Sequence, residues 1–274
     1  MRPESFAPNR FKDKVAIVTG SGQGIGFATA LRLGLEGARI VIADLSEESA
    51  AVAVKELALR GIEAVPVAGD LTRYEAAQRM VEVGEAAFGA IHVLVNNVGG
   101  TIWKKPFWYY REDEIRLEVE RSFWPPLWCC RAVIPVMRRT GGAIVNVGSN
   151  ATEGVYRVPY SASKGAVAAL TTSLANELVD LGIRVNCVEP GATDVQDRRV
   201  QRNTRPMSAE ESEWEKQFMT LIEKEGLIER FATVEEQASV IAFLASDEAS
   251  HVTGETIGTG RRGTGLRRIL GFIP

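Results

Sequence analysis

The chain is poor in cysteine, in histidine and in long apolar runs. Its 274 residues include three cysteines, Cys129, Cys130 and Cys187, of which two are neighbours. Three thiols cannot all pair, and two adjacent thiols do not suit a disulfide framework, so we expect free thiols and a reducing cytoplasm. The two histidines, His92 and His251, lie far apart, and no Cys/His spacing indicates a metal site.

No run approaches the roughly 20 apolar residues needed to span a membrane. The first residues, MRPESFAPNR, lack the apolar core of a signal peptide, so we expect a protein that is neither inserted nor exported. The chain also lacks a large excess of either charge. Its 32 Lys and Arg nearly balance its 35 Asp and Glu, which gives a net charge of -3. Such a balance creates no field that attracts phosphate-rich partners, so neither nucleic acid nor a membrane is an expected partner.

What the chain does contain is a regular alternation of strand-like and helix-like segments. Short β-branched runs, each ending in small or polar residues, occupy 15–20, 39–44, 64–70, 93–97, 143–149 and 183–191. Apolar residues at three- and four-residue spacing predict helices over 24–36, 46–60, 73–88, 114–138, 159–181 and 233–246. The alternation predicts a single α/β domain, a Rossmann-like doubly wound parallel sheet that binds ligands at the carboxyl ends of its strands.

Three segments depart from this alternation. Residues 1–13 are predicted to form a flexible leader. The segment 194–230, which includes a charged helical stretch, is too long for a simple connector and is typical of a substrate lid. Residues 258–274 form a basic, glycine-rich tail that does not resemble a strand.

The first strand runs into a glycine-rich turn, Thr19-Gly20-Ser21-Gly22-Gln23-Gly24-Ile25-Gly26, and then into a helix. Glycines let the backbone N–H groups at a helix N-terminus approach a pyrophosphate, so the turn predicts a dinucleotide site. Asp44 ends the second strand 18 residues after Gly26, where a carboxylate binds ribose hydroxyls and repels a 2′-phosphate. Neither Gln23 nor Leu45 supplies a cation for that phosphate, which favours NAD over NADP. The alternative is that Asp44 merely helps to cap the next helix.

Polar residues also follow the third and fourth strands. Asp70-Leu71 and Asn96-Asn97 fall along the same edge of the predicted sheet and suit the adenine and the adenosine ribose respectively. Asp and Asn also form turns without any ligand, which is the alternative interpretation.

Tyr160, Lys164 and Ser149 are the candidate catalytic residues. Positions four apart share a helix face, so the phenol and the ammonium point into one cavity, and Ser149 ends a strand eleven residues before Tyr160. A free tyrosine is a poor base at neutral pH, but positive charge from Lys164 and an oxidised nicotinamide stabilises the phenolate. Tyr160 then takes a proton from a carbinol whose carbon gives up hydride, while Ser149 holds the same oxygen. A Tyr/Lys pair at this spacing also occurs as surface decoration.

These residues resemble the motifs of the short-chain dehydrogenase/reductase family. The matching motifs are T-G-S-G-Q-G-I-G (19–26), N-N-V-G (96–99), Ser149, Y-S-A-S-K (160–164) and P-G (190–191). The resemblance implies that 14–257 is an NAD-binding catalytic domain, that the P-G turn and a following Thr border the nicotinamide, and that helices 108–138 and 159–181 build a homotetramer. The expected cofactor-binding residues are Gly20, Gln23, Gly24, Ile25, Gly26, Asp44, Asp70, Leu71, Asn97, Gly99, Tyr160, Lys164, Pro190, Gly191 and Thr193.

Three features depart from the family pattern. Ser122, in RSFWPP, stands where most members carry an Asn that supports a water in the proton relay, so Ser122 is a fourth catalytic candidate. The interval from Ser149 to Tyr160 is shorter than usual, which should reshape the loop over the substrate. The chain ends GTGRRGTGLRRILGFIP instead of in a strand and a D-G-G-like turn, which suggests a divergent or out-of-frame terminus.

Other segments resemble a narrower group. N-N-V-G-G-T-I-W-K-K-P-F (96–107), L-W-C-C (127–130), R-V-P-Y (157–160) and F-L-A-S-D-E-A-S (243–250) are similar to the cis-dihydrodiol carboxylate dehydrogenases of aromatic-acid degradation. The benzoate cis-diol enzymes match first and the p-cumate cis-diol enzymes second.

A carboxylate on the substrate ring needs a cation, and arginine offers bidentate geometry. Arg157, three residues before Tyr160, is the first candidate, and the predicted substrate-binding residues are Ser149, Arg157, Tyr160 and Arg199. The second set lies in the predicted lid and comprises Arg198, Arg199, Arg202 and Asn203. Alternatively, these arginines are solvated or tie the lid to the body. The tryptophans Trp103, Trp108 and Trp124 are candidates for an aromatic pocket, or for core and subunit interface.

Motifs and resemblance together predict an NAD-dependent dehydrogenase that oxidises a cis-dihydrodiol of an aromatic carboxylic acid to a catechol. If the diol includes the carboxyl-bearing carbon, the product is a β-keto acid that loses carbon dioxide; otherwise the carboxylate survives. Two other functions stay open. An NADPH-dependent carbonyl reductase is disfavoured by Asp44, and a catalytically silent NAD sensor is disfavoured by the intact set of Ser149, Tyr160 and Lys164.

Overall fold

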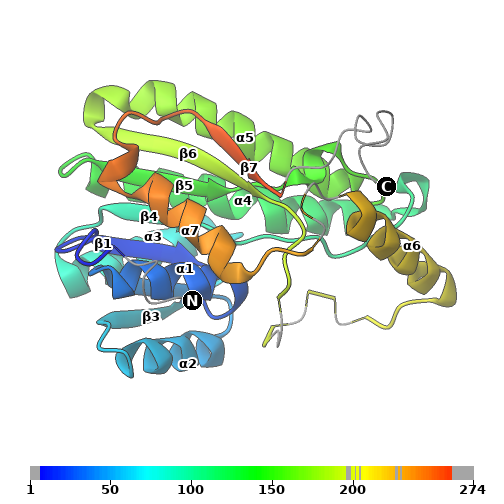
Figure 1. The fold of residues 1–274 in the computed structure, drawn as a ribbon, viewed down its shortest axis with the longest axis horizontal. Helices are drawn as coiled ribbons and strands as arrows, with labels where there is room; N and C mark the ends of the chain where they lie inside the picture. The colour runs from blue at the N-terminus through cyan, green and yellow to red at the C-terminus, as the bar shows by residue number, and fades with distance from the viewer. Residues whose placement is uncertain are drawn as a thin grey trace.

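Seven parallel strands form one sheet at the centre of the molecule (Figure 1). The computed structural model describes residues 7–195, 199–200, 202–203, 205–225, 228 and 230–260. The strands are β1 (Val15–Thr19), β2 (Arg39–Asp44), β3 (Ala64–Ala68), β4 (Val93–Asn96), β5 (Gly142–Val147), β6 (Ile183–Pro190) and β7 (Thr256–Thr259). Their order is β3-β2-β1-β4-β5-β6-β7, so the winding reverses between β1 and β4. At such a switch point the loops after neighbouring strands diverge and leave room for a ligand.

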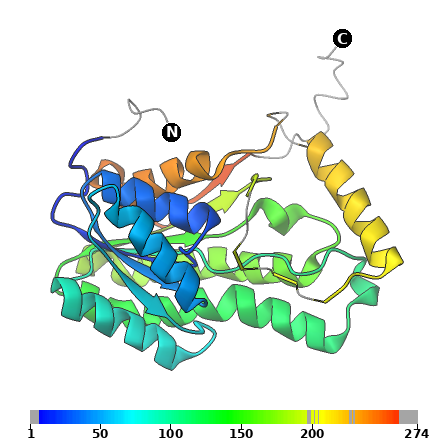
Figure 2. The ribbon, with the colours of Figure 1, turned by 90° about the horizontal axis from the view of Figure 1, so that it is seen from below.

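Helices cover both faces of this sheet (Figure 2). On one face lie α1 (Gly24–Leu35), α2 (Glu47–Ala58) and α7 (Val234–Ala245), and on the other lie α3 (Tyr74–Phe88), α4 (Glu112–Met137) and α5 (Val158–Leu178). Short 3-10 helices complete the described elements: η2 (Phe107–Tyr109), η3 (Asn150–Glu153), η4 (Val179–Leu181) and η5 (Asp247–Ala249). The predicted fold class, a doubly wound Rossmann-like parallel sheet, is confirmed.

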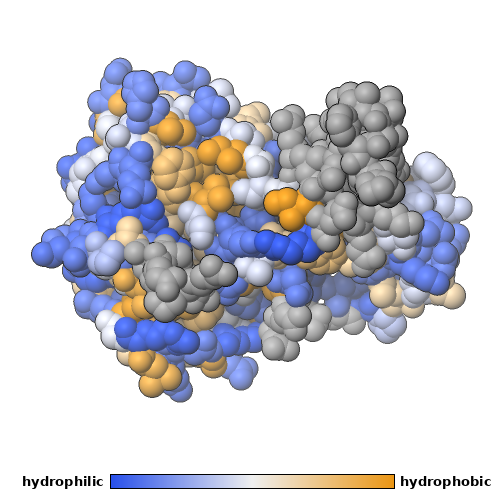
Figure 3. Space-filling model, in the orientation of Figure 1, coloured by the Kyte–Doolittle hydropathy of each residue, from blue (hydrophilic) through white to orange (hydrophobic). Residues whose placement is uncertain are grey.

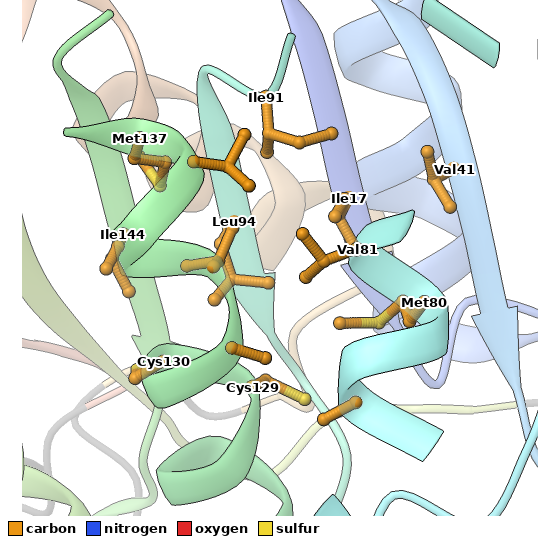
Figure 4. Close-up of a cluster of buried hydrophobic side chains, with 14 of the residues drawn as sticks. Ile17, Val41, Met80, Val81, Ile91, Leu94, Cys129, Cys130, Met137 and Ile144 are labelled. Carbon is orange, nitrogen blue, oxygen red and sulfur yellow. The ribbon is translucent and has the colours of Figure 1, made fainter. Parts of the chain in front are cut away.

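Two apolar clusters, one on each face, hold the helices to the sheet. In the cluster shown in Figure 4, Ile17 of β1 and Leu94 of β4 pack against Met80 of α3 and Cys129 of α4. All five residues of β1 are buried, because parallel strands covered on both faces meet no solvent. Such strands appear in the sequence as short apolar runs, which is why their positions could be predicted.

The last strand was not expected. Gly258 and Thr259, which the sequence analysis assigns to the tail, end β7, which pairs with β6. The backbone N–H of Gly191 donates to the carbonyl of Thr259 at 2.6 Å. The prediction of a tail from residue 258 is therefore wrong for these two residues, because parallel pairing uses backbone groups that small residues supply as well as large ones. Residues 261–274 lie outside the described part of the chain.

The predicted flexible leader is also wrong for residues 7–13, which pack beside the end of α1. Phe11 is 1% exposed, and its N–H donates to the carbonyl of Glu36 at 2.8 Å. The side chain of Glu36 is fully buried between two guanidinium groups. Its Oε2 accepts from Arg10 Nε at 2.6 Å, and its Oε1 accepts from Arg32, one helical turn earlier. A buried carboxylate needs such partners, because an unpaired charge is costly away from water.

α4 runs for 26 residues although three prolines lie inside it, at positions 125, 126 and 135. Proline has no N–H, so Pro126 cannot donate the usual helical hydrogen bond to the carbonyl of Ser122. The helix continues because it packs between α3 and α5 and buries side chains such as Cys129 and Val133. Tertiary packing here outweighs the local cost of the prolines.

α6 (Ala209–Glu225) stands apart from the two helical layers, near the carboxyl ends of β5 and β6 (Figures 1 and 2). It forms where the sequence analysis expects the charged helical stretch of the lid. No helix in the described ranges is long and apolar enough to cross a bilayer. On the face shown in Figure 3, hydrophilic residues surround separate hydrophobic patches.

Candidate active site

The glycine-rich turn between β1 and α1 forms a tight cradle. A Cβ at position 26 would lie 2.3 Å from the carbonyl oxygen of Gly20 and 2.6 Å from Asn97 Nδ2, so the turn requires glycine there. The first N–H groups of α1 have no acceptor within the helix, and no acidic residue lies in its first turn. This helix N-terminus is therefore suited to an anion.

Asp44 holds its carboxylate in a fixed direction at the end of β2. The residue is 6% exposed, its Oδ2 accepts from the N–H of Gly22 at 2.9 Å, and its Oδ1 accepts from the N–H of Ser46 at 3.1 Å. The cap of α2 is Ser46, whose Oγ accepts from the N–H of Ser49 at 3.1 Å. Asp44 is therefore not the N-cap residue itself, although its hydrogen bond to the N–H of Ser46 helps to fix the start of α2, as the alternative interpretation expects.

A cavity of about 380 Å³ opens at the edge where these two features meet. Its lining includes nine of the predicted cofactor-binding residues, namely Gly20, Gln23, Gly24, Ile25, Asp44, Asp70, Leu71, Asn97 and Gly99. The turn, the carboxylate and the ends of β3 and β4 therefore come together as the motif spacing predicts.

Other lining residues were missed by the sequence analysis. α4 contributes Leu117, Glu120, Arg121 and Pro125, and the segment after β6 contributes Val195, Val200 and Arg202, the last predicted only for the substrate. Arg121 directly precedes the predicted Ser122, but no pattern in the sequence indicates which face of α4 meets the cavity.

Two of the predicted polar residues also have structural roles. Asp70 Oδ1 accepts from the N–H and the hydroxyl of Thr72, so the residue makes a turn as well as lining the cavity. Asn97 Nδ2 donates to the carbonyls of Thr19 and Gly20 at 3.0 and 3.1 Å, which ties β4 to the glycine-rich turn. Asn96 points away from the cavity, because its side chain donates to Asn146 Oδ1 at 2.9 Å and to Cys130 Sγ inside the core.

Ser149, Tyr160 and Lys164 come from the end of β5 and the first turns of α5. All three are buried, at 6%, 7% and 2% exposure respectively, so the surface-decoration alternative is wrong. Lys164 Nζ donates to the carbonyl of Val147 at 2.7 Å and lies 5.9 Å from the centroid of the Tyr160 ring. Ser149 Oγ accepts from the N–H of Ala151 at 3.1 Å, which leaves its own proton to donate.

Ser122 lies near the same lysine. A Cβ at Gly99 would be 3.0 Å from Lys164 Nζ and 3.7 Å from the Cα of Ser122, so the lysine and the serine both border this glycine. Ser122 is fully buried, and within the described residues its Oγ has no hydrogen-bond partner. A buried hydroxyl of this kind is suited to hold a water molecule.

The Pro-Gly turn follows β6 and is braced by neighbouring elements. Thr193 Oγ1 donates to the carbonyl of Gly191 at 3.0 Å and accepts from Gln237 Nε2 at 3.2 Å. Gln237 also contacts Thr259 through its other amide atom. A second cavity, of about 320 Å³, lies here and is lined by residues that include Ala192, Gln237 and Thr259.

The two predicted substrate arginines lie at different places. Arg157 is the N-cap residue of α5, and its Cζ is 6.0 Å from the centroid of the Tyr160 ring. Arg199 instead donates to the carbonyl of Gly22 at 2.7 Å and pairs with Glu56 of α2. The structure thus brings Arg157, and not Arg199, beside Tyr160. Arg198 lies outside the described residues.

The segment that the sequence analysis predicts to be a lid also contacts the first cavity. Val200 exchanges hydrogen bonds of 3.0 and 3.2 Å with the side chain of Gln23, and the guanidinium of Arg202 packs on the backbone of Gly100. Arg121 donates to the carbonyl of Arg202 at 3.0 Å, and its pKa is lowered by burial and by the nearby charge of Arg202. Asn203 accepts from the N–H of Arg205.

The tryptophans do not form one aromatic pocket. Trp108 is 79% exposed, whereas Trp124 stacks on Trp128 of the same helix at 5.3 Å between centroids. Lys105 Nζ lies over the ring of Trp103, 6.0 Å from its centroid. In the part of the chain that the structure describes, no group of three or more His, Cys, Asp or Glu could hold a metal, and His92 instead accepts the N–H of Val15.

Known proteins match nearly the whole chain. The family described as short chain dehydrogenase matches residues 14–206. A 1,6-dihydroxycyclohexa-2,4-diene-1-carboxylate dehydrogenase of Acinetobacter baylyi is 47% identical over 252 residues, covering 92% of this chain and 96% of that protein. A 2,3-dihydroxy-2,3-dihydro-p-cumate dehydrogenase of Pseudomonas putida is 32% identical over 248 residues, covering 89% and 92%.

The fold has a solved counterpart as well. The crystal structure of gox2181 superposes with a TM-score of 0.81 at 29% sequence identity, covering 93% of this chain and 96% of the other. The family match, the curated relatives and the arrangement of the glycine-rich turn, Tyr160 and Lys164 agree. The chain therefore belongs to the short-chain dehydrogenase family.

Proposed function

We propose that this protein oxidises a cis-dihydrodiol of an aromatic carboxylic acid to a catechol, with NAD as the hydride acceptor. The observation that carries the proposal is the guanidinium of Arg157, which lies 6.0 Å from the ring of Tyr160. A cation beside the general base suits a substrate that carries a carboxylate near its carbinol. The names of the curated relatives, which refer to carboxylated dihydrodiols, support the same substrate class.

The residues fit a nicotinamide dinucleotide. The cradle at Gly26 excludes any side chain, and the N-terminus of α1 suits the pyrophosphate. The fixed carboxylate of Asp44 suits the ribose hydroxyls. When bound, NAD supplies the acceptor for the hydride of the carbinol carbon.

Residues of this chain carry out the proton transfer. Ser149 donates a hydrogen bond to the carbinol oxygen and orients it. Tyr160, as the phenolate, removes the proton from that oxygen, and the ammonium of Lys164 stabilises the negative charge that the phenolate carries. Ser122 holds a water beside Lys164, through which the proton leaves the buried site.

The position of the diol decides the product. Where the hydroxyl-bearing pair includes the carboxyl-bearing carbon, oxidation of the secondary carbinol gives a β-keto acid. This acid loses carbon dioxide and tautomerises to catechol, so no further catalytic group is needed. We propose this benzoate-type reaction first, because the 47% identical relative is named for it.

The test is NADH formation with two substrates, the benzoate 1,2-cis-diol and a 2,3-cis-diol of a substituted benzoate, with carbon dioxide trapped. We expect turnover of the 1,2-diol with equimolar gas release. Turnover of the 2,3-diol alone, without gas, would transfer the assignment to the p-cumate type. If neither diol reacts although the cofactor binds, the proposed function is wrong.

The choice of cofactor gives a second prediction. We expect kcat/KM with NAD to exceed that with NADP by about 100-fold, because a 2′-phosphate would face the buried carboxylate of Asp44. Asp44→Asn removes the charge but keeps an acceptor for the N–H of Ser46, so the preference should fall to about tenfold or less. The matched control is Asp180→Asn, an exposed site far from the cavity. A native preference for NADPH would instead favour a carbonyl reductase.

We also propose a cellular compartment and an oligomeric state for the enzyme. Three buried free cysteines suit a reducing cytoplasm. A homotetramer built on α4 and α5, as the family resemblance implies, would cover the stacked and partly exposed Trp124 and Trp128.

A further inference from the structure

The ring of Phe218, in α6, contacts two cations. The residue is 2% exposed, and the centroid of its ring lies 4.9 Å from Arg157 Cζ and 5.7 Å from Lys104 Nζ. The face of an aromatic ring attracts a cation through its quadrupole, more strongly where water is excluded. The ring therefore restrains the guanidinium that lies next to Tyr160.

The backbone on which Arg157 stands is already fixed. Tyr156, directly before it, adopts a left-handed φ of 64°, and its carbonyl accepts from the N–H of Lys105 at 2.7 Å and from Tyr110 Oη at 3.1 Å. What this backbone does not fix is the long side chain of Arg157. The rings of Tyr160 and Phe218, at 6.0 and 4.9 Å from its Cζ, are among the contacts that direct this side chain.

We propose that Phe218 is a positioning residue for substrate specificity, which holds the guanidinium of Arg157 where it binds the substrate carboxylate. The inference rests on the proposed function, because it needs a carboxylated substrate. It makes the lid helix a part of carboxylate recognition, although no residue of α6 needs to touch the substrate.

The docking of α6 does not depend on this ring alone. Lys104 pairs with Glu215, and Lys105 pairs with Glu211 at 3.4 Å. Tyr156 Oη donates to Gln217 at 3.1 Å. Trp214 packs on Tyr109 with centroids 4.7 Å apart. A change of Phe218 to another apolar residue should thus keep the helix in place while removing the face on which Arg157 rests.

The experiment compares two substrates, the benzoate 1,2-cis-diol and the uncharged cis-dihydrodiol of benzene. In Phe218→Leu we expect KM for the carboxylated diol to rise about fivefold, with little change in kcat. KM for the uncharged diol should stay within about twofold of its native value, because no carboxylate is involved. Phe218→Tyr, which keeps the ring, should restore the native KM for the carboxylated diol.

Trp214→Leu is the matched control, since it removes another aromatic ring from the same helix without touching Arg157. It should not discriminate between the two diols. Phe218→Met repeats the test with a second side chain that lacks a ring, and NADH fluorescence verifies that each variant is folded.

Each outcome bears on a different claim. If Phe218→Leu and Phe218→Met raise KM equally for both diols, or leave both unchanged, Phe218 has no positioning role. If Arg157→Met discriminates between the diols and the Phe218 variants do not, this inference fails while the proposed function stands. If the unmodified enzyme oxidises neither the benzoate 1,2-cis-diol nor the carboxylated 2,3-cis-diol, both fail together; if it oxidises only the 2,3-diol, the comparison is made with that diol in place of the 1,2-diol.

Discussion

Tyr160→Phe is expected to lower kcat by roughly 10³- to 10⁴-fold, because the variant loses the group that takes the proton from the carbinol. Cofactor affinity should change little, since the cradle at Gly26 and the carboxylate of Asp44 remain intact. Phenylalanine fills the same buried space, so the fold should tolerate it. The measurement is single-turnover NADH formation together with a titration of cofactor binding by protein fluorescence.

Tyr74→Phe is the control, because it removes a phenolic hydroxyl from the start of α3, where Tyr74 packs on Trp128. It should leave kcat unchanged. Full turnover in Tyr160→Phe would exclude Tyr160 as the general base. Loss of both turnover and cofactor binding would indicate a structural role for Tyr160 instead. Oxidation of a diol by the unmodified protein would exclude the alternative that it is a catalytically silent NAD sensor.

The second large effect concerns stability. Glu36→Gln should lower the free energy of unfolding by about 3 kcal/mol or more, because it leaves the guanidinium groups of Arg10 and Arg32 without their shared carboxylate in a buried site. Equilibrium unfolding in urea, at one fixed protein concentration, measures the change as a shift in midpoint.

Glu112→Gln makes the same chemical change in an exposed pair with Arg116, where the side chains are 80% and 71% exposed. Exposed ion pairs contribute little, so the loss should be about 0.5 kcal/mol or less. Equal losses in the two variants would show that burial of the Glu36 carboxylate does not govern its contribution. They would also show that the buried pairing of Glu36 with Arg10 is not what holds residues 7–13 against α1.

The parts of the site that lie within one element could be predicted from the sequence. Tyr160 and Lys164 share a face of α5 because they are four residues apart, and the burial of both agrees with that spacing. Asp44 and the glycine-rich turn are fixed by the end of one strand and the start of one helix. In each case a local pattern determines the geometry.

Contacts between distant segments could not be predicted in this way. Arg199 has the chemistry of a substrate ligand, yet its position depends on the path of the lid, which brings it to Gly22 and Glu56. The sequence of α6 does not indicate that the ring of Phe218 meets Arg157. Likewise, β7 contains only Thr, Ile and Gly, and its pairing with β6 depends on backbone groups that any residue supplies.

The prolines of α4 have a consequence for the family's missing asparagine. Because Pro126 has no N–H, it cannot donate the usual helical hydrogen bond to the carbonyl of Ser122. Ser122 therefore offers a hydroxyl and a carbonyl oxygen on the same turn, near Lys164. We infer that this main-chain oxygen can take over part of the role of the absent amide, and that a replacement of the Ser122 side chain would leave it in place.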